Sequence, residues 1–146
     1  MNKNQTRPFI GIIILGDYND FFVPLASPKA KHELMSNKKM DIYKIADGKL
    51  GVLNFNNMLP IPKTEIIFFN INIENNDNNN DIKYKTLLRN QLNYINDDKQ
   101  KIVKKAENLY KSYMNNFIDS SVVNRCCNFR LLEEKCNEWI LNKNLE

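Results

Sequence analysis

A serine hydroxyl, two lysine ammonium groups and the chain's only histidine fall within residues 27–32. Pro28 has no N–H to donate and suits the first position of a helix, which predicts Ser27 as the N-cap of a short helix. Lys29 and Lys31 would then lie at the positive end of the helix dipole, which disfavours cations unless an anion binds there. Two interpretations remain open: a phosphate site, or a capped surface helix with solvated lysines.

The length and composition describe one globular domain with a mild positive charge. The chain has 146 residues, 42% hydrophobic and 26% charged, and a formal net charge of +4. A chain of this length can bury a real core, but not two. Its charge permits a polyanionic partner without requiring one.

The cysteines and apolar runs favour a cytoplasmic protein without a metal centre, a cofactor or a membrane anchor. Cys126, Cys127 and Cys136 form an odd set with no C-x-x-C pair, and the only histidine lies far away in sequence. This pattern argues against a disulfide scaffold and against a zinc site. The apolar runs 9–15 and 66–69 are too short to span a bilayer. Residues 1–6 are polar and too few for a cleaved leader.

The first half of the chain is predicted to form strands. Continuous or alternating apolar runs, separated by turn residues, fall at 9–15, 21–25, 41–46, 50–54, 58–62 and 65–73. The first two should pair as a hairpin, and Asp47-Gly48 marks a tight turn between the next two. Pro60 and Pro62 confine the fifth run to an edge or an extended loop.

The second half is predicted to form helices. Residues 74–81 are almost all Asn, Asp and Glu, which predicts a mobile linker. Three helices should follow: one capped by Asp81, one opened by a capping box at 97–100, and one capped by Asn128. The prediction is a single domain over 1–146, strand-rich over 7–73, with the linker at 74–81 and helices over 82–142. Its class is α+β, with helices packed against one side or end of a twisted antiparallel sheet.

Several helical side chains admit two roles. Opposite the apolar stripe of the second helix, four lysines form a face that is either solvated or binds nucleic acid: Lys101, Lys104, Lys105 and Lys111. Tyr84 and Tyr94 could stack on bases, although aromatic residues at helical spacing are more often core. Cys136, on an apolar helix face, is more simply a small core residue than a reactive thiol.

Six segments in register resemble one family, the ToxN/AbiQ toxins of type III toxin–antitoxin systems. In chain order they are 7–11 (RPFIG); 22–29 (FVPLASPK) with Lys31 and His32; 41–45 (DIYKI); 51–58 (GVLNFNNM) with Pro60 and Pro62; Tyr84-Lys85 with Leu88, Gln91 and Leu92; and 127–129 (CNF) with 131–135 (LLEEK). The resemblance implies a MazF/Kid-like fold, a twisted sheet or partly open barrel packed with three to four helices.

The resemblance also implies an activity and a partner. Members are metal-independent endoribonucleases that cleave A-rich RNA through attack of the ribose 2′-hydroxyl, leaving 2′,3′-cyclic phosphate and 5′-hydroxyl ends. A structured repeat RNA, folded as a pseudoknot, acts as the antitoxin, and the toxin also processes it. Cellular or phage mRNA would be the other substrate, with phage abortive infection as the outcome. Because the RNA bridges neighbouring toxins, the expected assembly is an RNA-dependent oligomer.

Carried over by position, the resemblance assigns the site residues. Ser27 and Lys29 fall in the active site, and Arg7 stands where the family has a basic residue before its first core strand. The residues expected to bind RNA are Lys31, His32, Lys85, Arg89 and Tyr94. No metal ligand is expected.

The chemistry needs a base near the 2′-oxygen, a cation at the phosphate and a proton for the leaving 5′-oxygen. A single histidine rules out a two-histidine acid/base scheme. A lysine could act as the base if burial or Arg7 lowered its pKa, or could stay charged and stabilise the phosphorane. The sequence near Ser27 carries no acidic cluster at metal spacing, which disfavours two-metal hydrolysis.

Two departures from the family keep an alternative open. Members usually begin some twenty residues earlier with a tyrosine-containing segment, so we expect either an upstream start or a trimmed toxin. Ala26 stands where the family usually has a hydroxyl residue. The alternative is therefore a non-catalytic RNA-binding module, an N-terminally shortened relic of a toxin. A basic domain with a protein partner is a third possibility.

Overall fold

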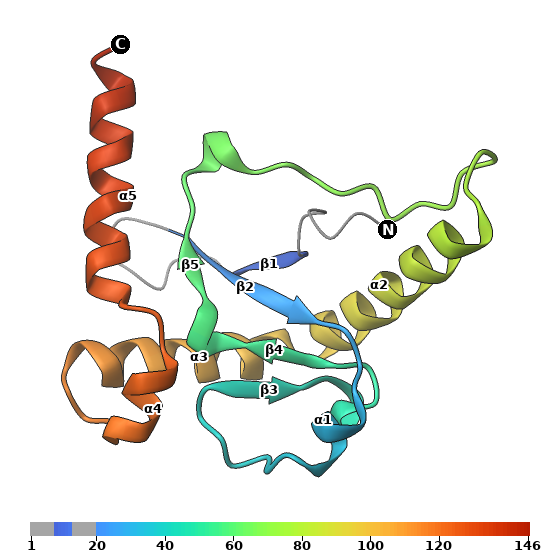
Figure 1. The fold of residues 1–146 in the computed structure, drawn as a ribbon, viewed down its shortest axis with the longest axis horizontal. Coiled ribbons are helices and arrows are strands. Elements are labelled where there is room, and N and C mark those ends of the chain that lie inside the picture. Colours follow the sequence, from blue (N-terminus) through green and yellow to red (C-terminus); the bar gives the residue numbers. More distant parts are fainter. Residues whose placement is uncertain (1–7, 13–19) are drawn as a thin grey trace.

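The computed structural model describes residues 8–12 and 20–146, in which an antiparallel sheet is flanked by helices (Figure 1). The strands are β1 (Phe9–Ile12), β2 (Phe21–Ala26), β3 (Ile42–Lys44), β4 (Val52–Asn54) and β5 (Leu59–Pro60). The helices are α1 (Ala30–Leu34), α2 (Asn79–Asp97), α3 (Lys99–Met114), α4 (Ser120–Arg125) and α5 (Phe129–Asn144), with 3-10 turns η1 (Ile45–Gly48), η2 (Phe55–Asn57) and η3 (Lys63–Glu65). The predicted α+β class is confirmed.

Strand β2 organises the sheet, whose order is β1-β2-β4-β3 with β5 also paired to β2. Its first part pairs antiparallel with β1 and β5, and its last two residues pair with β4. The predicted first hairpin is therefore confirmed over the described residues; positions 13–15 of the predicted strand lie outside them. Phe21, Val23 and Leu25 alternate along β2 and are 0%, 0% and 5% exposed. Pro24, on the opposite face, is buried as well.

The core lies between this sheet and the long helices. Apolar residues of β4 and the following turn meet Leu88 of α2, Ile102 and Leu109 of α3, and Phe129 of α5. Phe21 meets Phe129 edge-to-face, with 6.1 Å between ring centroids, so the start of α5 packs against β2. Figure 1 shows α2 and α5 toward opposite ends of the sheet, with α3 behind β3 and β4.

The hairpin predicted around Asp47-Gly48 is also confirmed. Strands β3 and β4 pair antiparallel from Ile42 opposite Asn54 to Lys44 opposite Val52. Between them, Ala46, Asp47 and Gly48 all adopt left-handed backbone angles, with φ of 51°, 55° and 89°. An Asp-Gly pair tolerates such angles better than most residues.

The strand predicted over 65–73 is wrong. Glu65 ends η3, and the residues after it are extended without joining a ladder in the described part of the chain. Ile67 and Phe68 are 90% and 93% exposed. The far end of this apolar run is anchored, because Ile71 packs against the core and Phe69 meets Tyr84 edge-to-face. A continuous apolar run fixes neither a register nor a partner, which explains the error.

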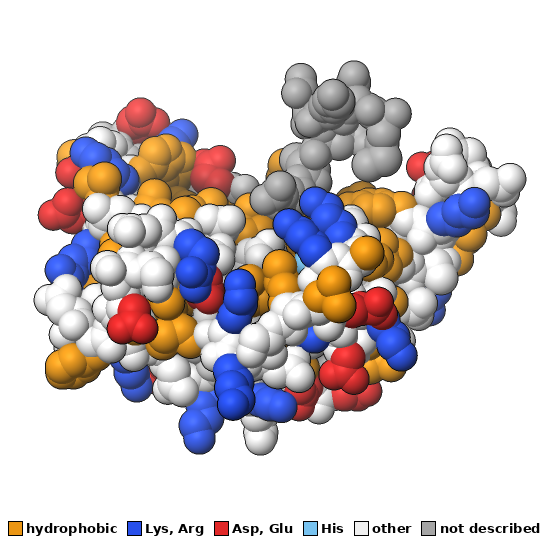
Figure 2. Space-filling view, turned by 60° about the horizontal axis from the view of Figure 1, so that its bottom comes forward, with side chains coloured by type: hydrophobic (Ala, Val, Ile, Leu, Met, Phe, Trp, Pro, Cys, Tyr) orange, Lys and Arg blue, Asp and Glu red, His pale blue; other side chains and the backbone are white. Residues whose placement is uncertain are grey.

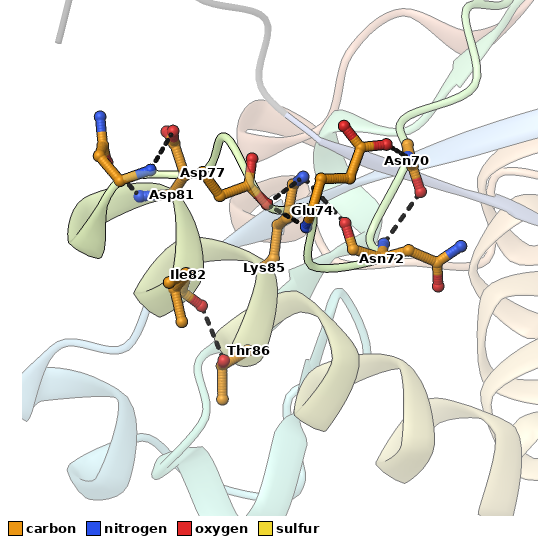
Figure 3. Close-up of polar contacts among 9 residues, drawn as sticks. Asn70, Asn72, Glu74, Asp77, Asp81, Ile82, Lys85 and Thr86 are labelled. Carbon is orange, nitrogen blue, oxygen red and sulfur yellow. Dashed lines mark hydrogen bonds and ion pairs between the residues drawn. The ribbon is translucent and has the colours of Figure 1, made fainter.

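The predicted mobile linker at 74–81 is instead a hydrogen-bonded entry into α2 (Figure 3). The helix begins two residues earlier than its predicted cap, because Asn78 caps it by accepting from the Asp81 N–H at 2.8 Å. The Asp81 carboxylate in turn accepts from the Asn78 N–H, which completes a capping box. Asp77 forms an ion pair with Lys85 at 2.7 Å, which ties this segment to the body of the helix.

The other two helix starts differ in their caps. Asn128 caps α5 as predicted, accepting from the Leu131 N–H at 3.1 Å. Asp98 precedes α3 but makes no side-chain capping bond, so the predicted capping box is wrong. The Asp98 carboxylate accepts instead from the Tyr43 hydroxyl, which links the start of α3 to β3. Helix α4 was not predicted.

Candidate functional site

The predicted chemical element, residues 27–32, follows the end of the central strand, and all of it except His32 is exposed. Ala26 is the last residue of β2 and pairs with Val52 of β4. Figure 1 shows the arrow of β2 running toward α1. Ser27, Lys29 and Lys31 are all exposed, so a hydroxyl and two ammonium groups lie on the surface where the sheet ends.

The helix that follows does not begin at Ser27, so that predicted N-cap is wrong. Helix α1 begins at Ala30, and Lys29 is its N-cap, with φ −138° and ψ 150°. The capping interaction comes from His32, whose Nδ1 accepts from the Lys29 N–H at 3.1 Å, while the His32 N–H donates to the Lys29 carbonyl at 2.9 Å. The Ser-Pro pair predicted a helix start that is too early, because the two hydrogen bonds between Lys29 and His32 place the start of the helix at Ala30.

His32 is the buried member of the segment, with 2% of its surface exposed. Burial lowers the pKa of its imidazole, and the nearby charges of Lys31 and Lys29 lower it further. Because Nδ1 accepts a hydrogen bond, we assign the neutral ring with its proton on Nε2. A side chain this buried does not fit the direct RNA contact expected from the sequence.

Two glycines of the hairpin between β3 and β4 let its backbone approach the end of β2 and the start of α1, and sequence reasoning missed both contacts. A Cβ on Gly48 would lie 2.6 Å from the carbonyl carbon and oxygen of His32. A Cβ on Gly51 would lie 2.0 Å from the carbonyl oxygen of Ala26. Both glycines have positive φ, 89° and 100°. The only available signal was their position on either side of a tight turn.

Lys44 of β3 supports the other end of α1. Its Nζ donates to the carbonyl oxygens of Glu33 and Met35, each at 2.9 Å. These carbonyls belong to the last turn of the helix, where they lack helical partners and where a cation is favoured. This role also has no sequence signal, because eleven positions separate Lys44 from Glu33.

The remaining predicted site residues lie apart from this segment along the chain. Arg7 lies outside the described residues. Arg89 and Tyr94 are exposed on α2, whereas Lys85 is buried and bonded to Asp77 and to the Asn72 carbonyl (Figure 3). A hydrogen bond ties α2 to the hairpin beside the segment, because the Gln91 amide donates to the Leu50 carbonyl at 2.8 Å, next to the η1 turn.

The lysines of α3 differ in their surroundings. Lys105 is half-buried and donates to the Ile42 carbonyl at 2.5 Å; burial lowers the pKa of its ammonium group. It therefore supports β3 rather than joining a solvated face. Lys111 forms an ion pair with Glu107 at 2.7 Å. In Figure 2, blue Lys and Arg side chains gather near the middle of the face shown, with red side chains toward both sides.

A buried carboxylate network was also missed. Asp41, fully buried just before β3, accepts two bonds from Arg125 of α4, at 2.9 and 3.1 Å, and one from Asn56 at 2.9 Å. Burial alone would raise the pKa of this carboxyl group, but the bonds from Arg125 and Asn56 hold it below its usual value. Cys136 is buried, as predicted.

The described part of the chain holds neither a metal-binding cluster nor a membrane-spanning helix. Among residues 8–12 and 20–146, no group of three or more His, Cys, Asp or Glu side chains is arranged to hold a metal ion. Within the same ranges, the helices are too short or too polar to cross a membrane.

Comparison with known proteins identifies relatives along almost the whole chain. "Endoribonuclease ToxN" of Bacillus thuringiensis subsp. kurstaki is 27% identical over 146 residues, covering 94% of this chain and 71% of the relative. "Endoribonuclease ToxN" of Pectobacterium atrosepticum is 28% identical over 138 residues, covering 91% and 75%. "Endoribonuclease AbiQ" of Lactococcus lactis subsp. lactis is 25% identical over 142 residues, covering 91% and 73%.

Solved structures agree with the sequence relatives. A chain from "A processed non-coding RNA regulates a bacterial antiviral system" superposes with a TM-score of 0.73 at 27% identity, covering 92% of this chain and 80% of that one. A second, from work on "selective toxin inhibition by a non-coding RNA pseudoknot", gives 0.70 at 25% identity, covering 94% and 82%. The family model described as "Toxin ToxN, type III toxin-antitoxin system" matches residues 1–137. With fold, motif order and relatives in agreement, this chain belongs to the ToxN family of type III toxin–antitoxin toxins.

Proposed function

We propose that this chain is a metal-independent endoribonuclease toxin that cleaves A-rich RNA at the segment 27–32. The observation that carries the proposal is that Ser27 and Lys29 are both exposed on one short segment. His32 accepts a hydrogen bond from the backbone of that segment, and Gly48 packs closely against the His32 backbone. A surface hydroxyl and a surface cation on a fixed backbone suit a phosphodiester, which offers acceptor oxygens and a negative charge. That the relatives are named endoribonucleases supports the same activity.

In the proposed reaction, the 2′-oxygen forms a bond to the adjacent phosphorus while the bond from phosphorus to the 5′-oxygen breaks. The 2′-hydroxyl proton passes to a base, and the departing 5′-oxygen gains a proton. Lys29 would stabilise the charge that accumulates on the phosphorane, and the Ser27 hydroxyl would donate to one of its oxygens. Arg7 is proposed as a further cation at the phosphate.

We further propose that a structured repeat RNA inhibits this toxin and is also processed by it. One relative is described as selectively inhibited by a non-coding RNA pseudoknot, which supports the same class of antitoxin here. Lys31, Arg89 and Tyr94 are exposed and available for RNA contact. Lys85 and His32, which are buried, would contribute by holding neighbouring backbone. The proposed location is the cytoplasm.

The decisive test is the substitution Lys29→Ala, measured on A-rich RNA with EDTA present. We expect at least a hundredfold loss of cleavage rate, because removing a preorganised donor at a developing charge typically costs about 10²–10³. Ser27→Ala should also reduce the rate. The matched control is Lys38→Ala, which removes an exposed lysine beyond α1. Mass spectrometry should find 2′,3′-cyclic phosphate and 5′-hydroxyl ends.

Three results would contradict this proposal: cleavage abolished by EDTA, 5′-phosphate products, or full toxicity of the Lys29→Ala protein in cells. A non-catalytic RNA-binding module remains the second candidate, motivated by Ala26 in place of a hydroxyl residue. That function predicts RNA binding that weakens with salt and no cleavage by the wild-type chain.

A further inference from the structure

We propose that Lys44 and His32 form a two-point clamp on helix α1 that fixes the backbone of Lys29, making both positioning residues of the ribonuclease site. This inference rests on the proposed function, since it concerns the geometry of the cation at the phosphate. It gives His32 a different role from the RNA contact expected for it. It also gives Lys44 a role that its sequence position does not indicate.

The clamp is needed because α1 is too short to hold itself. It has five residues, far below the roughly 12–15 at which isolated helices become even marginally stable in water. Its side chains Ala30, Lys31, Glu33 and Leu34 are all exposed, Leu34 at 88%, so burial of an apolar face does not stabilise it. His32 is the one helix residue that is buried. The helix must therefore be held by polar contacts at its ends.

The first point of the clamp is the pair of bonds between His32 and Lys29. The ring Nδ1 accepts from the Lys29 N–H at 3.1 Å, and the His32 N–H donates to the Lys29 carbonyl at 2.9 Å. His32 occupies the third helical position, where Glu or Gln usually accepts the N-cap N–H. A glutamate there would place a carboxylate beside the Lys29 and Lys31 ammonium groups. A neutral imidazole makes the same bond and leaves both charges available to a phosphate.

The second point of the clamp is Lys44. Its ammonium group bridges the Glu33 and Met35 carbonyls at 2.9 Å each. Because Lys44 belongs to β3, paired with Val52 of β4, these two bonds fasten the end of α1 to the sheet. Between the two points, Gly48 lets the η1 turn approach the His32 backbone without a side chain intervening. The Lys29 backbone is thus fastened to the same hairpin whose strand β4 pairs with Ala26, the residue before Ser27.

The test uses matched pairs of variants. Lys44→Met removes the two donated bonds and Lys44→Arg retains donors; His32→Leu removes the acceptor and His32→Gln retains one. Lys49→Met is the control for charge alone, because Lys49 is an exposed lysine at the end of the same turn. Each variant is measured for single-turnover cleavage at saturating A-rich RNA, for RNA affinity and for thermal midpoint.

We expect Lys44→Met and His32→Leu to lose at least about tenfold in single-turnover rate, since a misplacement of 1 Å at a catalytic group can cost about a hundredfold. Their RNA affinity should change no more than that of Lys49→Met. Lys44→Arg and His32→Gln should recover most of the rate. A merely structural role would lower the thermal midpoint without this separation of rate from affinity and without rescue by the conservative variants.

Amide hydrogen exchange supplies a readout that does not depend on activity. The Lys29 amide should be protected in the wild-type chain and in His32→Gln, and should exchange faster in His32→Leu and Lys44→Met. Folded clamp variants that cleave within threefold of wild type, while Lys29→Ala is inactive, would overturn this inference alone. An active Lys29→Ala protein would instead overturn the proposed function. If His32→Leu does not fold, Lys44→Met and the exchange data decide the question.

Discussion

Replacing Gly51 by alanine should destabilise the fold and displace the proposed site together. Gly51 has a φ of 100°, and a Cβ there would lie 2.0 Å from the Ala26 carbonyl oxygen and 3.3 Å from the Ser27 carbonyl carbon. Neither atom is the end of a flexible side chain, so the backbone at the end of β2 must move by about 1 Å to reach an ordinary contact. That movement disturbs the pairing of Ala26 with Val52.

The magnitude follows from two costs. Holding a non-glycine residue at such a φ costs about 1–3 kcal/mol, and weakening one ladder hydrogen bond costs about 1 kcal/mol. We therefore expect the free energy of unfolding to fall by roughly 3 kcal/mol, which for a chain of this size lowers the thermal midpoint by roughly 6–12 °C. Cleavage should fall even at temperatures where the variant is folded, because Ser27 shifts with the end of β2.

Urea unfolding followed by circular dichroism is the assay, with Asp47→Gly as the matched control. Asp47 already adopts a left-handed φ of 55° in the same turn, so glycine there relieves strain and should leave stability unchanged or slightly higher. A Gly51→Ala protein whose unfolding midpoint and cleavage rate both match wild type would refute the packing of this hairpin against the 26–27 backbone.

Three further predictions test other parts of the chain. Asp41→Ala should lower the free energy of unfolding by about 3 kcal/mol, because it leaves Asn56 and Arg125 without their buried partner. Since the folded-state pKa of Asp41 is lowered, its stabilising effect is present above about pH 4 and is lost as the pH falls further. An acid-unfolding series measures this loss. The lowered pKa of His32 means that the unfolded chain takes up the proton first, so the unfolding free energy should decline from about pH 6.5 downward in wild type and less in His32→Gln. Light scattering should find a monomer or weak dimer after nuclease treatment and a defined oligomer with antitoxin RNA; a stable larger oligomer without RNA would mean that protein contacts close the assembly.

Elements that depend on residues close together in the sequence were predicted correctly from sequence patterns. Alternation and an Asp-Gly turn placed the hairpin of β3 and β4, and a single asparagine placed the start of α5 at Asn128. One error arose where a local signal competed with a contact from elsewhere in the chain. Asp98 looked like a helix cap, but its carboxylate accepts from Tyr43, 55 positions earlier in the chain. For the apolar run at 65–73, the sequence indicates no partner strand, and the run forms no strand in the structure.

The candidate site divides in the same way. Its exposed chemical groups, Ser27 and Lys29, could be picked from the sequence because hydroxyl and ammonium groups close together are a local feature. The contacts that hold the backbone of this segment could not be predicted. They depend on a hydrogen bond from Lys44 to the Glu33 carbonyl, eleven positions away, and on the absence of a side chain at Gly48. The sequence likewise gave no sign that His32 is buried, and its contact with RNA stays a prediction.

The burial of His32 also bears on how two lysines can lie at the start of a five-residue helix, Lys29 as its N-cap and Lys31 within it. Lys29 and Lys31 repel each other and lie where the helix dipole disfavours cations, so solvent alone would not hold α1 in one conformation. The helix is instead held by contacts that bring no carboxylate near the lysines: the neutral ring of His32 within α1, and Lys44 and the Gly48 backbone from the neighbouring hairpin. A carboxylate at position 32 would stabilise the lysines more strongly than the neutral ring does. It would also pair with the positive charge that a phosphate would need in the proposed site. In the proposed site, a stronger partner for the lysines would therefore stabilise the segment but would reduce the charge available to a phosphate.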